Sequence, residues 1–297
     1  MATLRELKSR IGSVASSEKI TGAMKMISSA KMHKAEAALR RLVPYRSQIE
    51  TIIANLLSAD VAFTSPLVEH HTEVKRVAIV VLGSDDGLCG AYNVNISKRL
   101  LARISELRSQ YGSGLDIDIY PVGKKMIKIV SRFTDKTLNV VSVADDITTK
   151  SDGGQVKKFI NALEAEFLEN HVDLVDCVYM HYHSAGKQIL KAEQLLPIDS
   201  STFSAEGVAK ASVRPYLFEP DAESIFRSVL PLFLLSVMQE IFAQNRASEQ
   251  AARVMAMQSA NDNAKKLLEQ LQLEFNKLRQ QSITTELLDI VGGQVRD

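Results

Sequence analysis

The residues most able to do chemistry are gathered in a glycine-rich loop, Gly83-Ser84-Asp85-Asp86-Gly87-Leu88-Cys89-Gly90, which directly follows an apolar run. In a Rossmann-type domain, a turn at this place would bind phosphate. The loop matches neither GxGxxG nor GxxxxGKS/T, and its two carboxylates would repel an anion. Cys89 could be a nucleophile, but the sequence places no general base beside it. We therefore interpret Gly87, Leu88, Cys89 and Gly90 as a structural loop, with a tight turn that needs positive φ and a buried cysteine.

A second possible chemical group lies further along the chain, where Cys177, His181 and His183 could suggest a metal site. Their even spacing places them on one face of an expected strand, and no further ligand cluster is apparent nearby. Histidines on a half-buried strand usually need only a hydrogen bond. The sequence therefore predicts no catalytic residue, no metal ligand and no cofactor.

Charge is distributed unevenly over the 297 residues, although the formal net charge is only +1. Residues 1–58 carry ten Lys or Arg and four Asp or Glu, whereas the rest of the chain is weakly acidic. A basic segment in a near-neutral protein favours an acidic protein partner. Nucleic acid is disfavoured because no aromatic residues alternate with the cations. The cations of this segment include Lys19, Lys25, Lys31, Lys34, Arg40 and Arg41.

Both ends of the chain have the pattern of long helices. From Leu4 to Leu57, apolar residues recur at alternating steps of three and four, which indicates a coiled-coil seam. The stretch from Asp221 to Val291 has the same spacing. Neither helix can bury its apolar stripe within a small domain, so we expect an N-terminal helix at 1–58 to pair antiparallel with a C-terminal helix at 221–293. Ala and Ser in the middle of both helices predict a slim pair.

Between the two long helices, the pattern changes to strands that alternate with shorter helices. This alternation predicts a mostly parallel, Rossmann-like sheet with an antiparallel edge. The fold class is thus α/β plus a long antiparallel coiled coil, with the Rossmann-like domain at 74–200 inserted between the terminal helices. The expected strands are Arg76–Leu82, Ile117–Val122, Leu138–Val143 and a hairpin of Val172–His183 with Gln188–Leu196, and the expected helices are Val94–Leu107, Lys124–Phe133 and Val156–Leu168.

The cysteine spacing and the apolar stretches indicate the cellular compartment of the protein. Cys89 and Cys177 lie far apart without CxxC spacing, which favours a reducing, intracellular environment. The first residues lack the apolar core of a signal peptide. The most apolar stretch, Val229–Met238, has about half of the roughly 20 residues needed to cross a bilayer. These features predict a soluble chain.

Four motifs, in order along nearly the whole chain, resemble the gamma subunit of F-type ATP synthase. The C-terminal segment Gln281–Gly293 is similar to the family signature, in which Ile-Thr is followed by Glu-Leu and then by Ile-Val-x-Gly. Three further segments also match: Ala247–Met257 with Asp262-Asn263, Ile20–Met32, and the Gly-Leu-Cys-Gly loop at 87–90 followed by Asn93. The resemblance implies a central rotor shaft of the ATP synthase that has no catalytic site of its own.

The resemblance also implies partners and contact residues. The terminal helices would lie inside a hexamer of three alpha and three beta subunits, while the α/β domain would meet the epsilon subunit and the membrane ring of c subunits. Proton-driven rotation would force the beta sites through different nucleotide states, and hydrolysis would reverse the rotation. The beta-subunit contacts would be Met24, Lys25, Arg253, Arg279 and Gln280. An apolar tip, turning in a bearing, would consist of Ile283, Leu287, Leu288, Ile290 and Val291.

The sequence departs from the family pattern in two places. Asp86 stands where the family commonly has Arg, and the region 184–211 lacks the cysteine-bearing insertion of the chloroplast-type redox switch. Without a transit-like leader, we expect a peripheral location on the cytoplasmic face of the bacterial plasma membrane, with the matrix face of the mitochondrial inner membrane as the alternative. A Rossmann-type enzyme with helical arms and a static coiled-coil scaffold are the competing classes of function.

Overall fold

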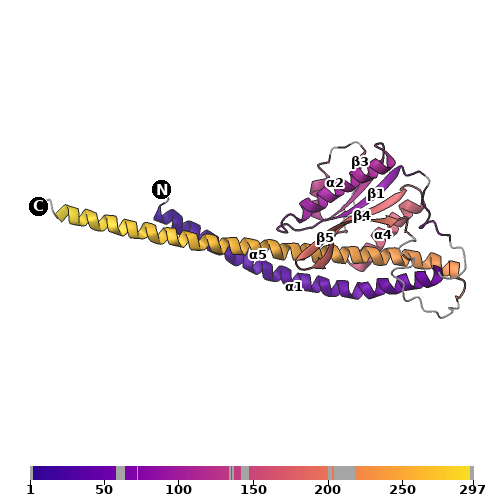
Figure 1. Cartoon of the computed structure of the whole chain (residues 1–297), viewed down its shortest axis with the longest axis horizontal. Coiled ribbons are helices and arrows are strands. Elements are labelled where there is room, and N and C mark those ends of the chain that lie inside the picture. The colour runs from indigo at the N-terminus through magenta and orange to yellow at the C-terminus, as the bar shows by residue number, and fades with distance from the viewer. Residues whose placement is uncertain are drawn as a thin grey trace. The chain divides into compact units, whose positions relative to one another are not determined.

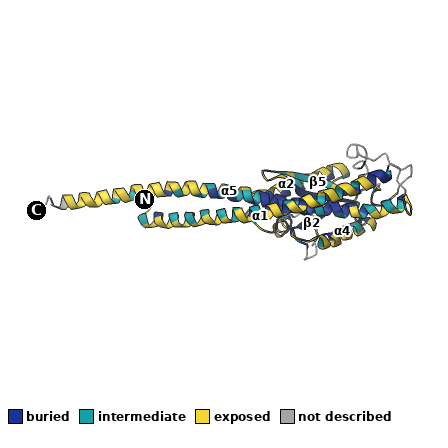
Figure 2. Ribbon diagram, turned by 90° about the horizontal axis from the view of Figure 1, so that it is seen from below, coloured by how far each residue is buried: buried dark blue, intermediate teal, exposed yellow. Residues whose placement is uncertain are grey.

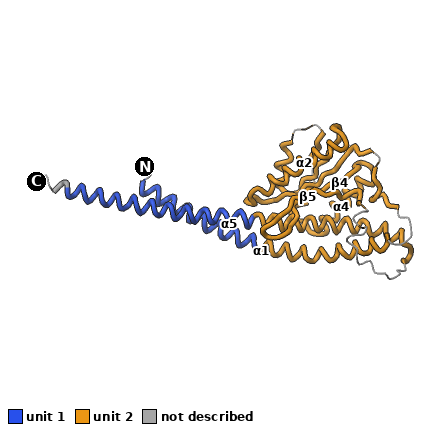
Figure 3. The backbone as a smooth tube through the Cα atoms, in the orientation of Figure 1, with its two compact units in different colours: residues 1–29, 253–297 blue, residues 30–252 orange. Residues whose placement is uncertain are grey.

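The computed structural model describes residues 3–57, 64–71, 73–133, 135, 137–141, 147–199, 203 and 218–294. The chain forms two compact units, which we call the helical unit (Met1–Ser29 with Arg253–Asp297) and the sheet unit (Ala30–Ala252) (Figure 3). Two long helices, α1 (Leu4–Leu57) and α5 (Ala222–Gln294), contribute to both units (Figure 1). The predicted domain limits at 58 and 200 lie outside the described residues, and those at 74, 221 and 293 stay predictions.

The described strands of the sheet unit are β1 (Arg76–Leu82), β2 (Asp116–Val122), β3 (Leu138–Val140), β4 (Leu174–Ser184) and β5 (Lys187–Leu196). They form one sheet in the order β3-β2-β1-β4-β5. β1 pairs in parallel with β2 and β4, β2 pairs in parallel with β3, and β4 with β5 is an antiparallel hairpin at one edge. Every residue of β1 after Arg76 is buried, as expected for a continuous apolar run covered on both faces. The predicted Rossmann-like sheet with an antiparallel edge is therefore confirmed.

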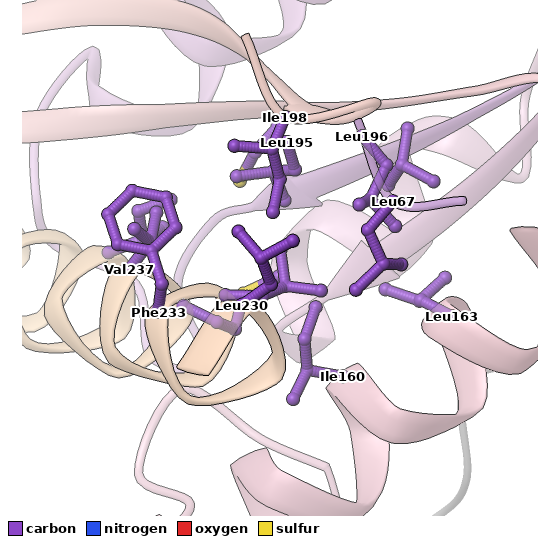
Figure 4. Close-up of a cluster of buried hydrophobic side chains, with 14 of the residues drawn as sticks. Leu67, Ile160, Leu163, Leu195, Leu196, Ile198, Leu230, Phe233 and Val237 are labelled. Atoms are coloured by element: carbon purple, nitrogen blue, oxygen red, sulfur yellow. The ribbon is translucent and has the colours of Figure 1, made fainter. Parts of the chain in front are cut away.

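The sheet separates two hydrophobic cores. One face packs against α2 (Tyr92–Tyr111) and α3 (Lys124–Val130), and the other against α4 (Gly153–Leu168) and the sheet-unit parts of α1 and α5. Figure 4 shows the second core, where side chains of α4, β5 and α5 gather. Burying one such side chain fully stabilises the fold by about 1.5–3 kcal/mol. The labelled residues are Leu67, Ile160, Leu163, Leu195, Leu196, Ile198, Leu230, Phe233 and Val237.

Helix α4 begins three residues before its predicted start at Val156 because a capping box precedes it. The Asp152 side chain accepts the N–H of Gln155 at 2.9 Å, and the Gln155 side chain accepts the N–H of Asp152 at 3.0 Å. These two bonds satisfy N–H groups that a helix start leaves without partners. Gly153 and Gly154 are therefore helical in spite of their low helix propensity.

Within each unit, α1 and α5 lie side by side and run in opposite directions (Figures 1 and 2). By length and composition alone, α5 contains an apolar window able to cross a membrane, and 56% of that window is buried inside the protein. Its buried residues, from Phe226 to Phe242, belong to the core that covers the sheet. This window thus has the burial of a core helix.

Candidate functional site

The glycine-rich loop between β1 and α2 uses its polar groups internally. Ser84 is fully buried, and its N–H donates to Asn93 Oδ1 at 3.0 Å while its Oγ accepts from Asn93 Nδ2 at 2.8 Å. The Asp85 carboxylate accepts the Lys124 N–H at 3.2 Å and the Thr149 hydroxyl at 2.5 Å. The Asp85 carboxylate therefore joins the loop to the start of α3 and to Thr149, so its hydrogen bonds are made within the chain.

A buried side chain from α5 bonds the backbone at the carboxyl end of β1. The chain order reverses there, since β2 lies on one side of β1 and β4 on the other, and Rossmann-like sheets bind ligands at such points. Asn245 Nδ2 donates to the Gly83 carbonyl at 2.9 Å, and Asn245 Oδ1 accepts from the Tyr92 hydroxyl at 2.7 Å. Asn245 is only 1% exposed. The geometry therefore does not support nucleotide binding at this loop.

The turn in this loop depends on one of its glycines and on a leucine. Left-handed backbone occurs at Leu88 (φ 64°) and Gly90 (φ 62°) but not at Gly87. Leu88 is 59% exposed, and a leucine rarely adopts such a conformation. Gly83 is needed for space, because a Cβ there would lie 2.6 Å from the Cβ of Met126.

The cysteines and histidines singled out from the sequence do not gather into a site. Cys89 is buried, with its Sγ 3.5 Å from Asn93 Nδ2. Cys177 is fully buried in β4, and burial raises the pKa of its thiol. His181 bonds through Nδ1 to the side chain of Gln244. Among the described residues, no three His, Cys, Asp or Glu side chains lie close enough together to hold a metal ion.

Exposed apolar side chains line α1 in the helical unit. Ile20, Met26 and Ile27 are 59%, 68% and 56% exposed, whereas Met24 and Lys25 are half-buried. Apolar side chains of this size, gathered on one helix, are typical of a surface that another protein covers. Sequence reasoning named Met24 and Lys25 as contacts here but did not single out Ile20, Met26 and Ile27. The signal was present, because Ile20 and Ile27 are apolar although they lie outside the buried seam of the helix.

Residues expected to contact a partner differ in exposure along α5. Arg253 is only 6% exposed and interacts within the chain. Arg279 and Gln280 are both exposed. The predicted apolar tip is exposed as well, as the C-terminal turns of Figure 2 show. The exposed fractions are 49% for Ile283, 57% for Leu287, 65% for Leu288, 62% for Ile290 and 58% for Val291.

A close contact joins the two helices of the helical unit. Asn261 Nδ2 of α5 donates to the Glu18 carbonyl of α1 at 2.7 Å. A Cβ at Gly22 would lie 3.3 Å from this amide nitrogen, so glycine leaves room for it. This bond to a backbone carbonyl fixes the axial position of one helix relative to the other within this unit.

Comparisons with known proteins agree with this architecture over the whole chain. The family described as ATP synthase matches residues 3–295. The ATP synthase gamma chain of Bacteroides fragilis is 40% identical over 295 residues, which cover 99% of this chain and 100% of the relative. That of Cupriavidus pinatubonensis is 36% identical over 295 residues, with 99% of each chain covered.

Solved structures show the same fold. A chain in the cryo-EM structure of the Euglena gracilis mitochondrial ATP synthase superposes with a TM-score of 0.62 at 19% identity, covering 98% of this chain and 93% of that one. The family match over residues 3–295 and the 36–40% identity over nearly the full length lead to one conclusion. The chain belongs to the family of ATP synthase gamma chains, which are non-catalytic subunits of that enzyme.

Proposed function

We propose that this chain works through the exposed surfaces of its two long helices. The chain is the central rotor shaft of an F-type ATP synthase, which couples proton-driven rotation of the membrane ring to conformational cycling of the catalytic beta subunits, and the reverse during hydrolysis. Its partners are the alpha and beta subunits and the c ring, together with the epsilon subunit. The observation that carries this function is the helical unit, whose two paired helices expose apolar and cationic side chains.

A shaft can control three identical catalytic sites only by differential contact. A partner shifts a conformational equilibrium by the difference in its affinity for the two conformations. The described surface of the helical unit varies along its helices, because α1 presents Ile20, Met26 and Ile27, and α5 presents Arg279 and Gln280 before its apolar tip. Three beta subunits around this unit would each meet different side chains, so each would favour a different nucleotide state.

The direct contacts to the beta subunits would be made at Met24, Lys25, Arg279 and Gln280. The exposure of Arg279 and Gln280 supports this role for them. Arg253, by contrast, would act from a buried position, by holding the helix surface in place rather than by direct contact. The tip residues would slide within an apolar sleeve, since more than half of the surface of Leu287 and of Leu288 is exposed.

The cellular location of this chain follows from the ATP synthase complex to which it belongs. A gamma chain is held at the membrane peripherally, through the c ring. The bacterial relatives support the cytoplasmic face of the plasma membrane as that location. The matrix face of the mitochondrial inner membrane is the alternative, and fractionation of the native cells distinguishes the two.

Purification from native membranes tests the function. A tagged chain extracted in mild detergent should bring one copy per three alpha and three beta subunits, and ATP hydrolysis should require the complex. A static scaffold is distinguished by a disulfide cross-link between the chain and a beta subunit, which should stop a rotor reversibly and leave a scaffold active. Hydrolysis that continues at the uncrosslinked rate would exclude rotation.

A further inference from the structure

A single turn of α5 in the sheet unit, Gln244–Arg246, is bonded to several separate parts of the α/β fold. Asn245, in the middle of this turn, donates to the Gly83 carbonyl at the end of β1. The Tyr92 hydroxyl of α2 bonds both the side chain and the backbone carbonyl of Asn245, at 2.7 and 3.0 Å. One residue of α5 is thus tied to the central strand and to a helix on the opposite face of the sheet.

The residues on either side of Asn245 bond other elements. Arg246 Nε donates to the Thr149 carbonyl and Arg246 Nη2 to the Ser151 carbonyl, both at 3.0 Å, in the segment just before α4. The Gln244 side chain bonds His181 Nδ1 on β4. Three consecutive side chains of α5 therefore hold the first strand, the fourth strand and the start of α4.

The geometry of a helix gives this arrangement a mechanical meaning. Successive residues of an α-helix point about 100° apart, so three in a row span about 200° of its circumference. A helix whose bonds all lie on one side can still rotate about its own axis. A helix that is bonded over about 200° of its circumference within one turn resists that rotation. The acceptors at Gly83, Thr149 and Ser151 are backbone carbonyls, which yield less than flexible side chains.

The next turn of α5 combines small side chains with the buried side chain of Glu249. Ala247, Ser248 and Ala251 are fully buried, and their side chains are small. Small side chains allow close packing but present no long lever against rotation of the helix. The polar side chains of Gln244–Arg246 thus add directional bonds, which resist twisting, to the apolar packing of α5 against the sheet.

We propose that Gln244–Arg246, with Gly83, Tyr92, Thr149, Ser151 and His181, forms a torsional clasp that passes torque between the α/β fold and α5. The inference rests on the proposed rotor function and assigns positioning residues to it. Because α5 continues without a break from the sheet unit into the helical unit, torque that enters α5 at the clasp is carried along the same helix.

The test is torsional stiffness in the complete ATP synthase, with its alpha and beta subunits fixed to a surface. A probe is attached to a cysteine introduced at the exposed Lys157 of α4, since Cys89 and Cys177 are buried and do not compete for the label. The variance of the probe angle is measured in a stalled state. Asn245→Ala with Arg246→Ala leaves Gln244 as the last of the three bonded side chains. If the three act independently, the stiffness of the clasp falls to about a third, and the angular variance that the clasp allows should rise about threefold.

A matched control lies on the same helix. Glu223 and Arg227 form an exposed ion pair, 2.7 Å long, and replacing both by alanine removes two polar side chains of α5 outside the clasp. The variance of this control should equal that of the unaltered protein. The clasp variant should also pump fewer protons per ATP hydrolysed as the opposing proton gradient is raised. Variance and pumping equal to the control would overturn the clasp.

A second variant covers the case in which the double substitution prevents assembly. Tyr92→Phe removes only a hydroxyl, and it should raise the variance less than Asn245→Ala. The two changes together should raise the variance by less than the sum of their separate effects, because both remove the bond between the Tyr92 hydroxyl and Asn245 Oδ1, whereas the bond to the Asn245 carbonyl is lost only in Tyr92→Phe. Additive effects or an unchanged variance in Tyr92→Phe would reject the clasp. A probe that fails to rotate on the unaltered complex would instead reject the rotor function.

Discussion

Arg103→Met should destabilise the fold in a way that depends on pH, because it leaves a buried carboxylate without its counter-ion. Asp176 of β4 is fully buried, and its Oδ2 accepts from Arg103 Nε at 2.6 Å. Its Oδ1 has no hydrogen-bond partner within the described residues. Burial raises the pKa of Asp176, and the Arg103 guanidinium opposes this rise only in part. Losing the partner of a buried charge typically costs about 3–5 kcal/mol.

The sign of the pH effect follows from this pKa. Because the folded state holds the Asp176 proton more tightly than the unfolded chain, stability is greatest at low pH and falls as the pH rises above the unfolded pKa. At pH 8 the variant should lose about 3–5 kcal/mol. At pH 5, only about one unit above the unfolded Asp pKa of about 3.9, protonation limits the loss from the charge to about 1.5 kcal/mol.

Urea unfolding followed by far-ultraviolet circular dichroism, at pH 5 and pH 8, measures these losses. Asp176→Asn is the control, since Arg103→Met in that background should cost nearly the same free energy at both pH values. The reasoning is refuted if Arg103→Met alone loses equal stability at pH 5 and pH 8, or if the pH dependence persists without the carboxylate.

Two further substitutions and one labelling experiment have defined outcomes. Leu230→Ala should lower the free energy of unfolding by about 2–5 kcal/mol, because Leu230 is fully buried between α5 and the sheet, and a loss below about 1 kcal/mol in urea titration would contradict this packing. Cys89 and Cys177 should not react with a maleimide until urea unfolds the chain, and modification of either in the native protein, detected by mass spectrometry, would contradict their burial. Arg279→Glu should reduce ATP synthesis by the complex while leaving the helicity of the chain unchanged, because its side chain is exposed; unimpaired synthesis would remove Arg279 from the proposed contacts.

Sequence patterns predicted the elements well, because their signals are local. The short apolar run of Arg76–Leu82, rich in β-branched residues, favoured a strand buried on both faces, and the long repeats of three and four residues indicated helices. The limits of short helices were less accurate. α3 ends at Val130 rather than at Phe133, and α4 begins earlier because Asp152 and Gln155 form a capping box.

The polar contacts could not be predicted, because their partners are distant in the sequence. Asn245 and Arg246 stand in a helix where polar residues usually face water, yet they bond residues 162 and 95–97 positions away. Leu88 was missed as a left-handed residue because glycines stand nearby at 87 and 90, and glycine adopts this backbone conformation more readily. Arg253 was expected at a partner surface, but its burial depends on neighbours that no local pattern specifies.

The exposed end of α5 also ties the folding of this chain to its assembly. Every residue from Ile283 to Val291 is exposed, so these turns gain little from packing within the described chain. An isolated helix of this length is marginal in water. The surrounding subunits would therefore act as a template that supplies the missing stabilisation. A chain that has not been assembled would present an apolar helix to chaperones and proteases, which gives the cell a way to recognise surplus copies.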